Sequence, residues 1–368
     1  MNVKVRFSII TLLCAALVAI SGVSSCKKSN SEKTKQYLNG SLRVKNWPSY
    51  IGVGETFSVK ISGVSHPKQG TEGHKLGFYY SISDISKTTD TVYRVGVNPL
   101  PVPMDNVPVD IPDFDGLDTL GTFSFVGTVY PEDNNDYYSS TVSYSITTID
   151  AERSLPQARV DKSRPYFCDG RELEELDMCY NYIEADTLGN PYNLLWMQQN
   201  LAYLGSGRGY YNYDIMSRMF GRYYTWEEAQ TACPDGWRLP TDQDWADLAN
   251  TVNPQGFYTP GKNFENIAGA LKMDARFNGL DMWEYWPESV ITSTSTFHAL
   301  PCGYCNAGAA LEFKGIQEFA CFWTADSVDG DDAYYRYIYT GEDDLKLGVG
   351  DKKALAISVR CVSDKKDE

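Results

Sequence analysis

Histidine is scarce in this chain of 368 residues, which contains three. None of them lies in a recognisable catalytic motif, so a Ser-His-Asp triad is not expected. Zinc sites need several suitably spaced ligands, and His298 is the only histidine of the second half. We therefore expect no zinc site and name no catalytic residue.

Basic residues are also in short supply, with 33 Lys and Arg against 48 Asp and Glu and a formal net charge of −15. Proteins bind nucleic acids largely through Lys and Arg contacts to phosphates, so nucleic acid is not an expected partner. Long apolar runs are missing after the N-terminus, so no later segment is expected to cross a bilayer.

The N-terminus carries the long apolar run, at residues 7–20, between two basic residues and a pair of serines before Cys26. This order is typical of a secretory signal, and the serines followed by cysteine resemble a bacterial lipobox. The resemblance implies a lipoprotein signal peptide over residues 1–25 and a lipid on the sulfur of Cys26. We expect the lipid bilayer as a partner and an outer-membrane location, facing either the periplasm or the cell surface. The alternative is an ordinary signal with an incidental cysteine.

Residues 26–37 are polar and rich in serine and lysine, which is typical of a tether between a lipid anchor and a folded body. The lysines after Cys26 differ from the acidic run associated with surface export in Bacteroidetes, which argues against outward exposure.

The first half of the body lacks cysteine and shows no amphipathic helix pattern. Apolar and polar residues alternate in 57–61, 122–126 and 141–146, which is typical of half-buried strands. This half resembles the immunoglobulin-like spacer domains of bacterial surface proteins. We expect a mainly β, immunoglobulin-like sandwich over residues 38–150, followed by a polar linker over residues 151–164.

Cysteine and tryptophan are concentrated in the second half. Seven of the nine cysteines lie there, at Cys168, Cys179, Cys233, Cys302, Cys305, Cys321 and Cys361. Cysteines of exported proteins usually pair. Because seven is odd, at least one must be free or bridged to another molecule.

The segment 233–241, CPDGWRLPT, is predicted to be a corner between two helices. Thr225 followed by Glu228 is the pattern of a capping box, and this first helix must end before Pro234. Thr241 is the expected N-cap of the second helix, with Asp244 in its first turn. Every residue of the corner therefore has a structural role.

Several motifs follow one another in the order of a known family. They are WMQQNL at 196–201, GRYYTW at 221–226, CPDGWRLPT at 233–241, ALP at 299–301, FWT at 322–324, YYR at 334–336 and SVRCV at 358–362. This series resembles the Fibrobacter succinogenes major paralogous domain, which is common in lipoproteins of gut Bacteroidetes. The resemblance covers residues 165–363 and leaves a tail at 364–368.

The layout also resembles the C-type-lectin-like fold, an α+β domain in which a helix of the form WxEAxxxC precedes a second helix. In that fold the cysteine of the helix bridges to the last strand. The resemblance implies a Cys233–Cys361 disulfide. We expect a local pair of Cys168 and Cys179, which leaves the remaining three cysteines for one further bridge and one free thiol.

The segment Cys302-Gly303-Tyr304-Cys305 has the spacing of thiol–disulfide oxidoreductases, in which a helix after the first cysteine lowers its pKa. No strong helix pattern follows it, and no βαβ pattern surrounds it. The formylglycine-generating enzymes share the RLPT corner and bind copper through a cysteine pair, but the context of Cys302 and Cys305 differs. A structural pair is the preferred interpretation, and an enzyme of the redox or formylglycine-generating type is the alternative.

Calcium is the one cofactor that the sequence leaves open. The EPN or QPD and WND triplets of sugar-binding lectins are absent. Asp329, Asp331 and Asp332, or the acidic run 342–344, could supply carboxylates. Neither run follows the register of an EF-hand, so we expect no cofactor and treat these residues as minor candidates.

Tyrosine is abundant, with 26 residues. Aromatic faces beside carboxylates suit glycan or protein recognition, because they offer rigid apolar area. The alternative is that tyrosine merely fills a domain rich in loops. We predict a non-enzymatic binding or adhesion role towards a glycan or a surface protein. The candidate ligand-binding residues are Tyr210, Tyr211, Tyr334, Tyr335 and Trp323.

Overall fold

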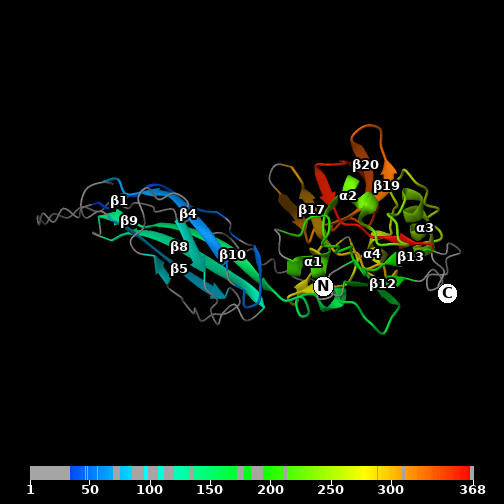
Figure 1. The fold of residues 1–368 in the computed structure, drawn as a ribbon, viewed down its shortest axis with the longest axis horizontal. Helices are drawn as coiled ribbons and strands as arrows, with labels where there is room; N and C mark the ends of the chain where they lie inside the picture. The colour runs from blue at the N-terminus through cyan, green and yellow to red at the C-terminus, as the bar shows by residue number, and fades with distance from the viewer. Residues whose placement is uncertain are drawn as a thin grey trace, which may run out of the picture.

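The computed structural model describes residues 34–45, 47, 49–55, 57–68, 75–84, 95–97, 107–111, 120–132, 136–171, 178–183, 194–210, 214–287, 289–308 and 311–364. The expected signal peptide, the lipidation site Cys26 and the ligand candidate Tyr211 lie outside these residues. No helix within the described ranges is both long enough and apolar enough to span a membrane. Figure 1 shows an elongated N-terminal part made of strands beside a rounder C-terminal part.

Three sheets build the N-terminal part. The largest has the order β3 (Tyr50–Gly52), β10 (Ser140–Ile149), β8 (Gly121–Pro131), β5 (Leu76–Asp84) and β6 (Val95–Val97). A second contains β2 (Asn39–Lys45), β4 (Phe57–Ser65) and β7 (Val107–Ile111), and a third pairs β1 (Gln36–Tyr37) with β9 (Tyr137–Tyr138). The part of the chain that the structure describes is mainly β.

The two larger sheets share one core. Val59 and Ile61 of β4 are buried together with Phe78 of β5 and with Phe123 and Phe125 of β8. These residues occupy alternate positions along their strands, so their side chains point to the same face of each sheet. The alternation predicted in 57–61 and 122–126 is thereby confirmed.

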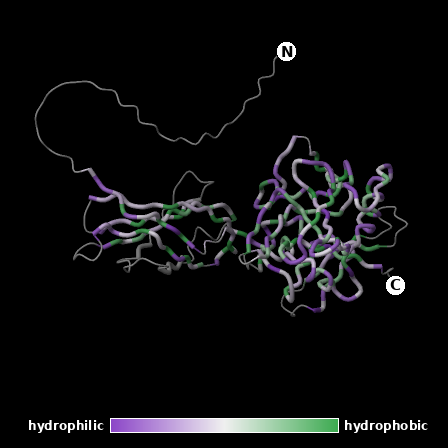
Figure 2. Tube along the Cα trace, turned by 90° about the horizontal axis from the view of Figure 1, so that it is seen from above, coloured by the Kyte–Doolittle hydropathy of each residue, from purple (hydrophilic) through white to green (hydrophobic). Residues whose placement is uncertain are grey.

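The two parts meet in a packed junction around the 3₁₀ helix Pro156–Ala158. Leu155 is buried in one cluster with apolar residues of the C-terminal part, and Figure 2 shows hydrophobic residues where the parts meet. The ring of Tyr50 lies 5.3 Å from that of Tyr210. Asn278 donates from its amide to the carbonyl of Thr148 at 2.9 Å. The segment expected as a linker is therefore anchored by contacts on both sides.

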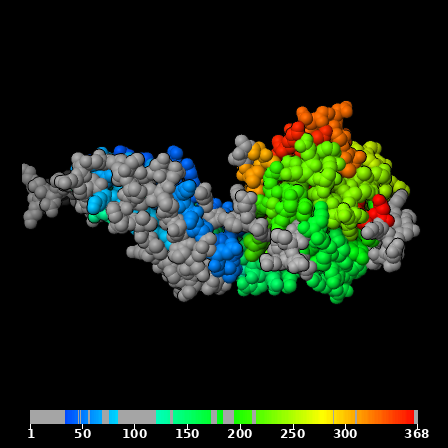
Figure 3. Space-filling view, in the orientation of Figure 1, coloured from blue at the N-terminus to red at the C-terminus, as the bar shows by residue number. Residues whose placement is uncertain are grey.

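A seven-stranded sheet dominates the C-terminal part. Its order is β14 (Tyr224–Thr225), β22 (Leu355–Ile357), β17 (Cys302–Asn306), β19 (Phe319–Ser327), β20 (Asp332–Tyr339) and β21 (Leu345–Asp351), with β18 (Glu312–Ile316) paired to β17. The hairpin of β19 and β20, in orange, stands at the upper edge of this part in Figures 1 and 3.

Smaller elements surround this sheet. A four-stranded sheet contains β11 (Tyr166–Cys168), β12 (Cys179–Ile183), β13 (Leu195–Met197) and β23 (Val362–Ser363), and a hairpin pairs β15 (Arg276–Phe277) with β16 (Leu280–Asp281). The helices are α1 (Asp214–Phe220), α2 (Trp226–Ala232), α3 (Asp242–Val252) and α4 (Ala268–Leu271).

The predicted corner between α2 and α3 is confirmed. Thr225 and Glu228 form a capping box at the start of α2. Thr241 and Asp244 form a second one at the start of α3. Arg238 donates to Asp244 at 2.6 Å, so the corner is held by charge as well as by the caps.

Two of the expected disulfides are present, Cys233–Cys361 and Cys168–Cys179. The third expected bridge is wrong, because Cys302, Cys305 and Cys321 are all free and buried. Cys302 and Cys305 lie three positions apart on β17, which keeps a regular register with β18. Gly303 between them has a φ of 71°, so the strand does not alternate regularly here, and both cysteines are buried in one cluster with Ala356. Their sulfurs form no bridge.

Candidate ligand-binding site

One face of the seven-stranded sheet carries an aromatic groove of about 350 Å³, called here the tyrosine groove. Its lining residues are Tyr304, Phe319, Cys321, Tyr335, Tyr337, Leu355 and Ile357. Tyr335 lies across Gly348 of the neighbouring strand, where a Cβ atom would come within 2.3 Å of its ring. The glycine therefore lets the ring lie against the sheet.

The other sequence candidates do not join Tyr335 in this groove. Tyr334 comes directly before Tyr335 on β20, so its side chain points to the opposite face of the sheet. Trp323 is fully buried, and its indole N–H donates to the carbonyl of Tyr224 at 2.7 Å. Tyr210 is buried at the junction against Tyr50. The ligand-binding assignments of Trp323 and Tyr210 are therefore corrected, because neither ring is accessible to a ligand.

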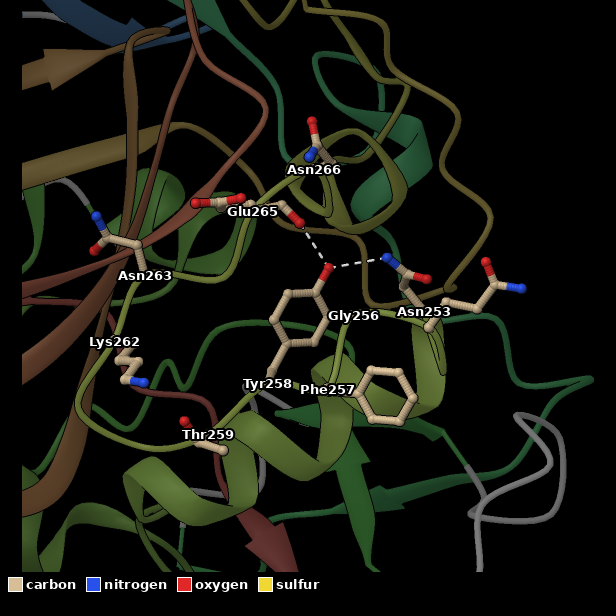
Figure 4. A pocket seen from close by; sticks show the side chains of 10 residues that line it. Asn253, Gly256, Phe257, Tyr258, Thr259, Lys262, Asn263, Glu265 and Asn266 are labelled. Atoms are coloured by element: carbon tan, nitrogen blue, oxygen red, sulfur yellow. Dashed lines mark hydrogen bonds between the residues drawn. The ribbon is translucent and has the colours of Figure 1, made fainter.

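A second cavity, called here the loop pocket, lies in the loop that follows α3 and is formed by residues 253–266 (Figure 4). Its volume is about 360 Å³. Tyr258 sits at its centre: its hydroxyl accepts from the amide of Asn253 at 2.9 Å and donates to the carbonyl of Glu265 at 2.6 Å. Asn250 of α3 accepts from the backbone N–H of Tyr258 and donates to its carbonyl. The two hydrogen bonds of Asn250 fix the loop to the helix, and the other two hold the loop to itself.

The far side of the loop is tied to the sheet. Arg336 of β20 donates to the carbonyl of Lys262 at 2.6 Å and lies 3.7 Å from the ring centroid of Phe264. The backbone N–H of Leu347, on the edge strand β21, donates to the side chain of Asn263 at 3.0 Å. The loop is thereby fixed at both ends, so the pocket is largely preformed.

Phe257 is the unusual residue of the loop pocket. Its side chain is 82 % exposed, and its backbone has a φ of 50°. The preceding Gly256 could not carry a Cβ, which would meet the Tyr258 ring at 2.2 Å. The loop therefore turns the half-buried Tyr258 towards the core and Phe257 outward.

Polar side chains line the loop pocket together with Phe257. Gln255, Glu265 and Asn266 are exposed and make no side-chain hydrogen bond to the part of the chain that the structure describes. The two amides can both donate and accept, while the carboxylate accepts. A pocket lined by an exposed aromatic ring, uncommitted amides and a carboxylate is suited to a ligand that has an apolar face and several hydroxyl groups.

With this geometry in place, comparison with known proteins gives one clear match. Residues 167–363 match the Fibrobacter succinogenes major domain. The chain belongs to this family. No curated protein sequence matches the chain.

Solved structures add little about this Fibrobacter succinogenes major domain protein. The superoxide reductase (neelaredoxin) from Ignicoccus hospitalis shares 14 % identity with it, over 33 % of this chain and 100 % of that chain, with a TM-score of 0.22. A variant of the same enzyme also shares 14 % identity, over 30 % and 82 % of the two chains, again with a TM-score of 0.22. At that TM-score the likeness carries no argument about fold or function.

The acidic residues at 329–332 and 342–344 are the candidates for calcium. Among the residues that the structure describes, no three His, Cys, Asp or Glu form a group that could hold a metal ion. Asp329 and Asp331 are exposed, and Asp332 begins β20. In the run 342–344, the carboxylate of Asp343 accepts from the backbone N–H of Gly269 at 2.6 Å. The expectation of no cofactor, with calcium left open, stays a prediction.

The free thiols of the domain are buried and weakly acidic. Burial raises the pKa of Cys302 to about 12 and that of Cys305 to about 11. It also raises the pKa of Cys321, which lies in the floor of the tyrosine groove. Redox catalysis needs an accessible cysteine of low pKa, so these features speak against a catalytic pair.

Sequence reasoning missed the loop pocket in this domain. The signal that could have indicated it is the concentration of four amides in residues 253–266, between turn-forming proline and glycine residues. No feature of the sequence indicates that Phe257 is exposed, because a phenylalanine in a loop can be buried as well as exposed.

Proposed function

We propose that this protein is a lipid-anchored protein of the cell envelope that binds a glycan at the loop pocket and catalyses no reaction. The observation that carries the proposal is Phe257, which is 82 % exposed on a left-handed backbone. That backbone costs a non-glycine residue about 1–3 kcal/mol, and an exposed ring adds no burial energy. A binding role for the ring accounts for both the strained backbone and the exposure.

The polar side chains that line the pocket with Phe257 fit a sugar. A sugar hydroxyl both donates and accepts hydrogen bonds, as do the amides of Gln255 and Asn266, while Glu265 accepts from it. The Phe257 ring can cover the C–H face of a pyranose. Because the hydrogen bonds of Tyr258 already fix the loop, binding needs to order few groups, which lowers its entropic cost.

The proposed roles of the other segments fit a protein that holds its binding domain away from the membrane. In this proposal Cys26 carries the lipid, residues 26–37 form the tether and an immunoglobulin-like sandwich over 38–150 is the spacer. Figure 1 shows β1 at the end of the N-terminal part that lies far from the C-terminal part. A lipid attached before β1 would therefore hold the binding head away from the membrane.

The head itself is proposed to be C-type-lectin-like. Support comes from the Cys233–Cys361 disulfide, which joins the end of α2 to the segment before β23. Further support comes from the order of α2, α3, a long loop and the strands of the main sheet. The loop pocket lies in that long loop.

A glycan array tests the proposal with the mature chain. We expect the wild type to bind one group of glycans and Phe257→Ala to lose that binding at least about ten-fold. Tyr138→Ala, which removes another exposed aromatic ring, is the matched control and keeps the affinity. Equal binding by wild type and Phe257→Ala, or an array without any binding, contradicts the proposal.

A further inference from the structure

Exposed apolar side chains concentrate in one short stretch of the C-terminal part. Leu280 is 71 % exposed, Tyr285 83 %, Trp286 41 % and Val290 68 %. Tyr285, Trp286 and Val290 line one cavity. Exposed apolar groups gathered in one place mark interaction sites, and Tyr and Trp contribute most to protein interfaces. Trp286 and Tyr285 border a cavity of about 440 Å³ that also includes Lys272, Asp274, Trp283 and Glu284, called here the tryptophan pocket.

The two exposed rings are held in position by the backbone before them. The N–H of Glu284 donates to the carbonyl of Gln317 at 3.1 Å. The carbonyl of Glu284 accepts from the hydroxyl of Thr340 at 2.6 Å. Trp286 rests against Gly341, where a Cβ would lie 3.2 Å from its ring. The fold therefore fixes the backbone before Tyr285 and places the Trp286 ring at the rim of the pocket.

The two cationic side chains at the pocket, Lys272 and Arg276, already have partners within the domain. Lys272 is buried, and its ammonium group donates to the Ser289 hydroxyl and to the carbonyls of Thr340 and Glu342. It also lies 5.1 Å from the Trp283 ring. At the rim, Arg276 pairs with Asp281 at 3.3 Å. The Lys272 ammonium is therefore not available to an anionic ligand, and the charge of Arg276 is balanced by that of Asp281.

Two carboxylates remain without a counter-charge. Asp274 and Glu284 are exposed and have no ion-pair partner within the described part of the chain. Aromatic rings attract cations to their faces, and arginine in particular stacks on them. Rings and free carboxylates together thus favour a cationic group, in a protein whose net charge is −15.

We propose that the tryptophan pocket is a docking site for a basic segment of a partner protein. A lysine or arginine side chain enters between Tyr285 and Trp286 and pairs with Asp274 or Glu284. This site shares no lining residue with the loop pocket, so it is a second interaction surface beside the proposed glycan site.

The test titrates the mature chain with a nine-residue arginine peptide and a nine-residue lysine peptide, followed by tryptophan fluorescence and calorimetry. We expect saturable binding that Trp286→Ala and Tyr285→Ala each weaken about five-fold, the size of one cation–π contact. Phe257→Ala leaves peptide binding unchanged, which separates this proposal from the glycan proposal.

A charge-matched control separates a site from general attraction. The double variant Asp274→Asn with Glu284→Gln is expected to weaken binding at least ten-fold. The double variant Asp329→Asn with Asp331→Asn removes the same charge on a distant turn and is expected to have little effect. Equal loss in both double variants overturns the proposal, as does an absence of peptide binding. Equally tight binding of free arginine also overturns it, since the site would then serve a small cation.

Discussion

Arg336 and Asp242 form an ion pair of 2.6 Å in which the arginine side chain is fully buried and the carboxylate nearly so. The pair joins β20 to the first turn of α3. Arg336 also holds the carbonyl of Lys262, and Asp242 accepts from the backbone N–H of Gly261 at 2.7 Å. One buried pair thus fixes the helix, the sheet and the loop that forms the loop pocket.

Removing one member of that pair should lower the stability of the fold strongly. Arg336→Met leaves Asp242 buried without its partner, so we expect the free energy of unfolding to fall by about 3–5 kcal/mol. Urea unfolding followed by fluorescence measures the loss. Arg276→Met, which breaks an exposed pair with Asp281, is the control and should cause a much smaller loss. Similar losses in both variants would contradict the role given to the buried pair.

The two disulfides should differ in their contributions. Cys233–Cys361 spans 128 residues and Cys168–Cys179 spans 11. On the chain-entropy view, the longer loop contributes about 5 kcal/mol and the shorter about 3 kcal/mol. Urea unfolding of the two double Cys→Ala variants without reductant checks this order. A larger loss from the shorter loop would show that strain or local contacts decide instead.

The three free thiols should be inert in the folded protein. The pKa values of Cys302 and Cys305, raised by burial to about 12 and about 11, leave little thiolate at pH 8. An alkylating reagent at that pH should therefore label none of the free cysteines until the protein is unfolded, as followed by mass spectrometry. Rapid labelling of Cys302 or Cys305 in the native protein would favour the enzyme alternative.

Lys272 should make stability depend on pH in the alkaline range. Burial lowers its pKa from 10.5 to about 8, and Asp343 opposes the shift. Between pH 8 and 10.5 the folded state therefore binds fewer protons here than the unfolded state. The contribution of this group to the free energy of unfolding consequently rises with pH across that window.

The comparison with Lys272→Met isolates this effect from other titrating groups. We expect the difference in free energy of unfolding, wild type minus variant, to increase from pH 7.5 to pH 10. Urea unfolding at several pH values measures it. A difference that stays constant over this range would mean that the lysine keeps an ordinary pKa.

Features set by near neighbours in the chain could be predicted well. The capping boxes at Thr225 and Thr241 each depend on a residue three positions later in the chain. The buried residues of β4 and β8 follow from simple alternation of apolar and polar residues. The Cys233–Cys361 pairing was available only through the resemblance to a known fold, because spacing alone does not fix disulfide connectivity.

The sequence by itself determined the family, the strand-rich character, the helix caps and the place of the corner, because these follow from local patterns and ordered motifs. The tertiary structure alone decided that Trp323 and Tyr210 are buried while Phe257 is exposed. It also decided that Arg336 meets Asp242, 94 residues away in the chain. Accessibility and charge pairing depend on which distant segments pack together, and no local pattern encodes that information.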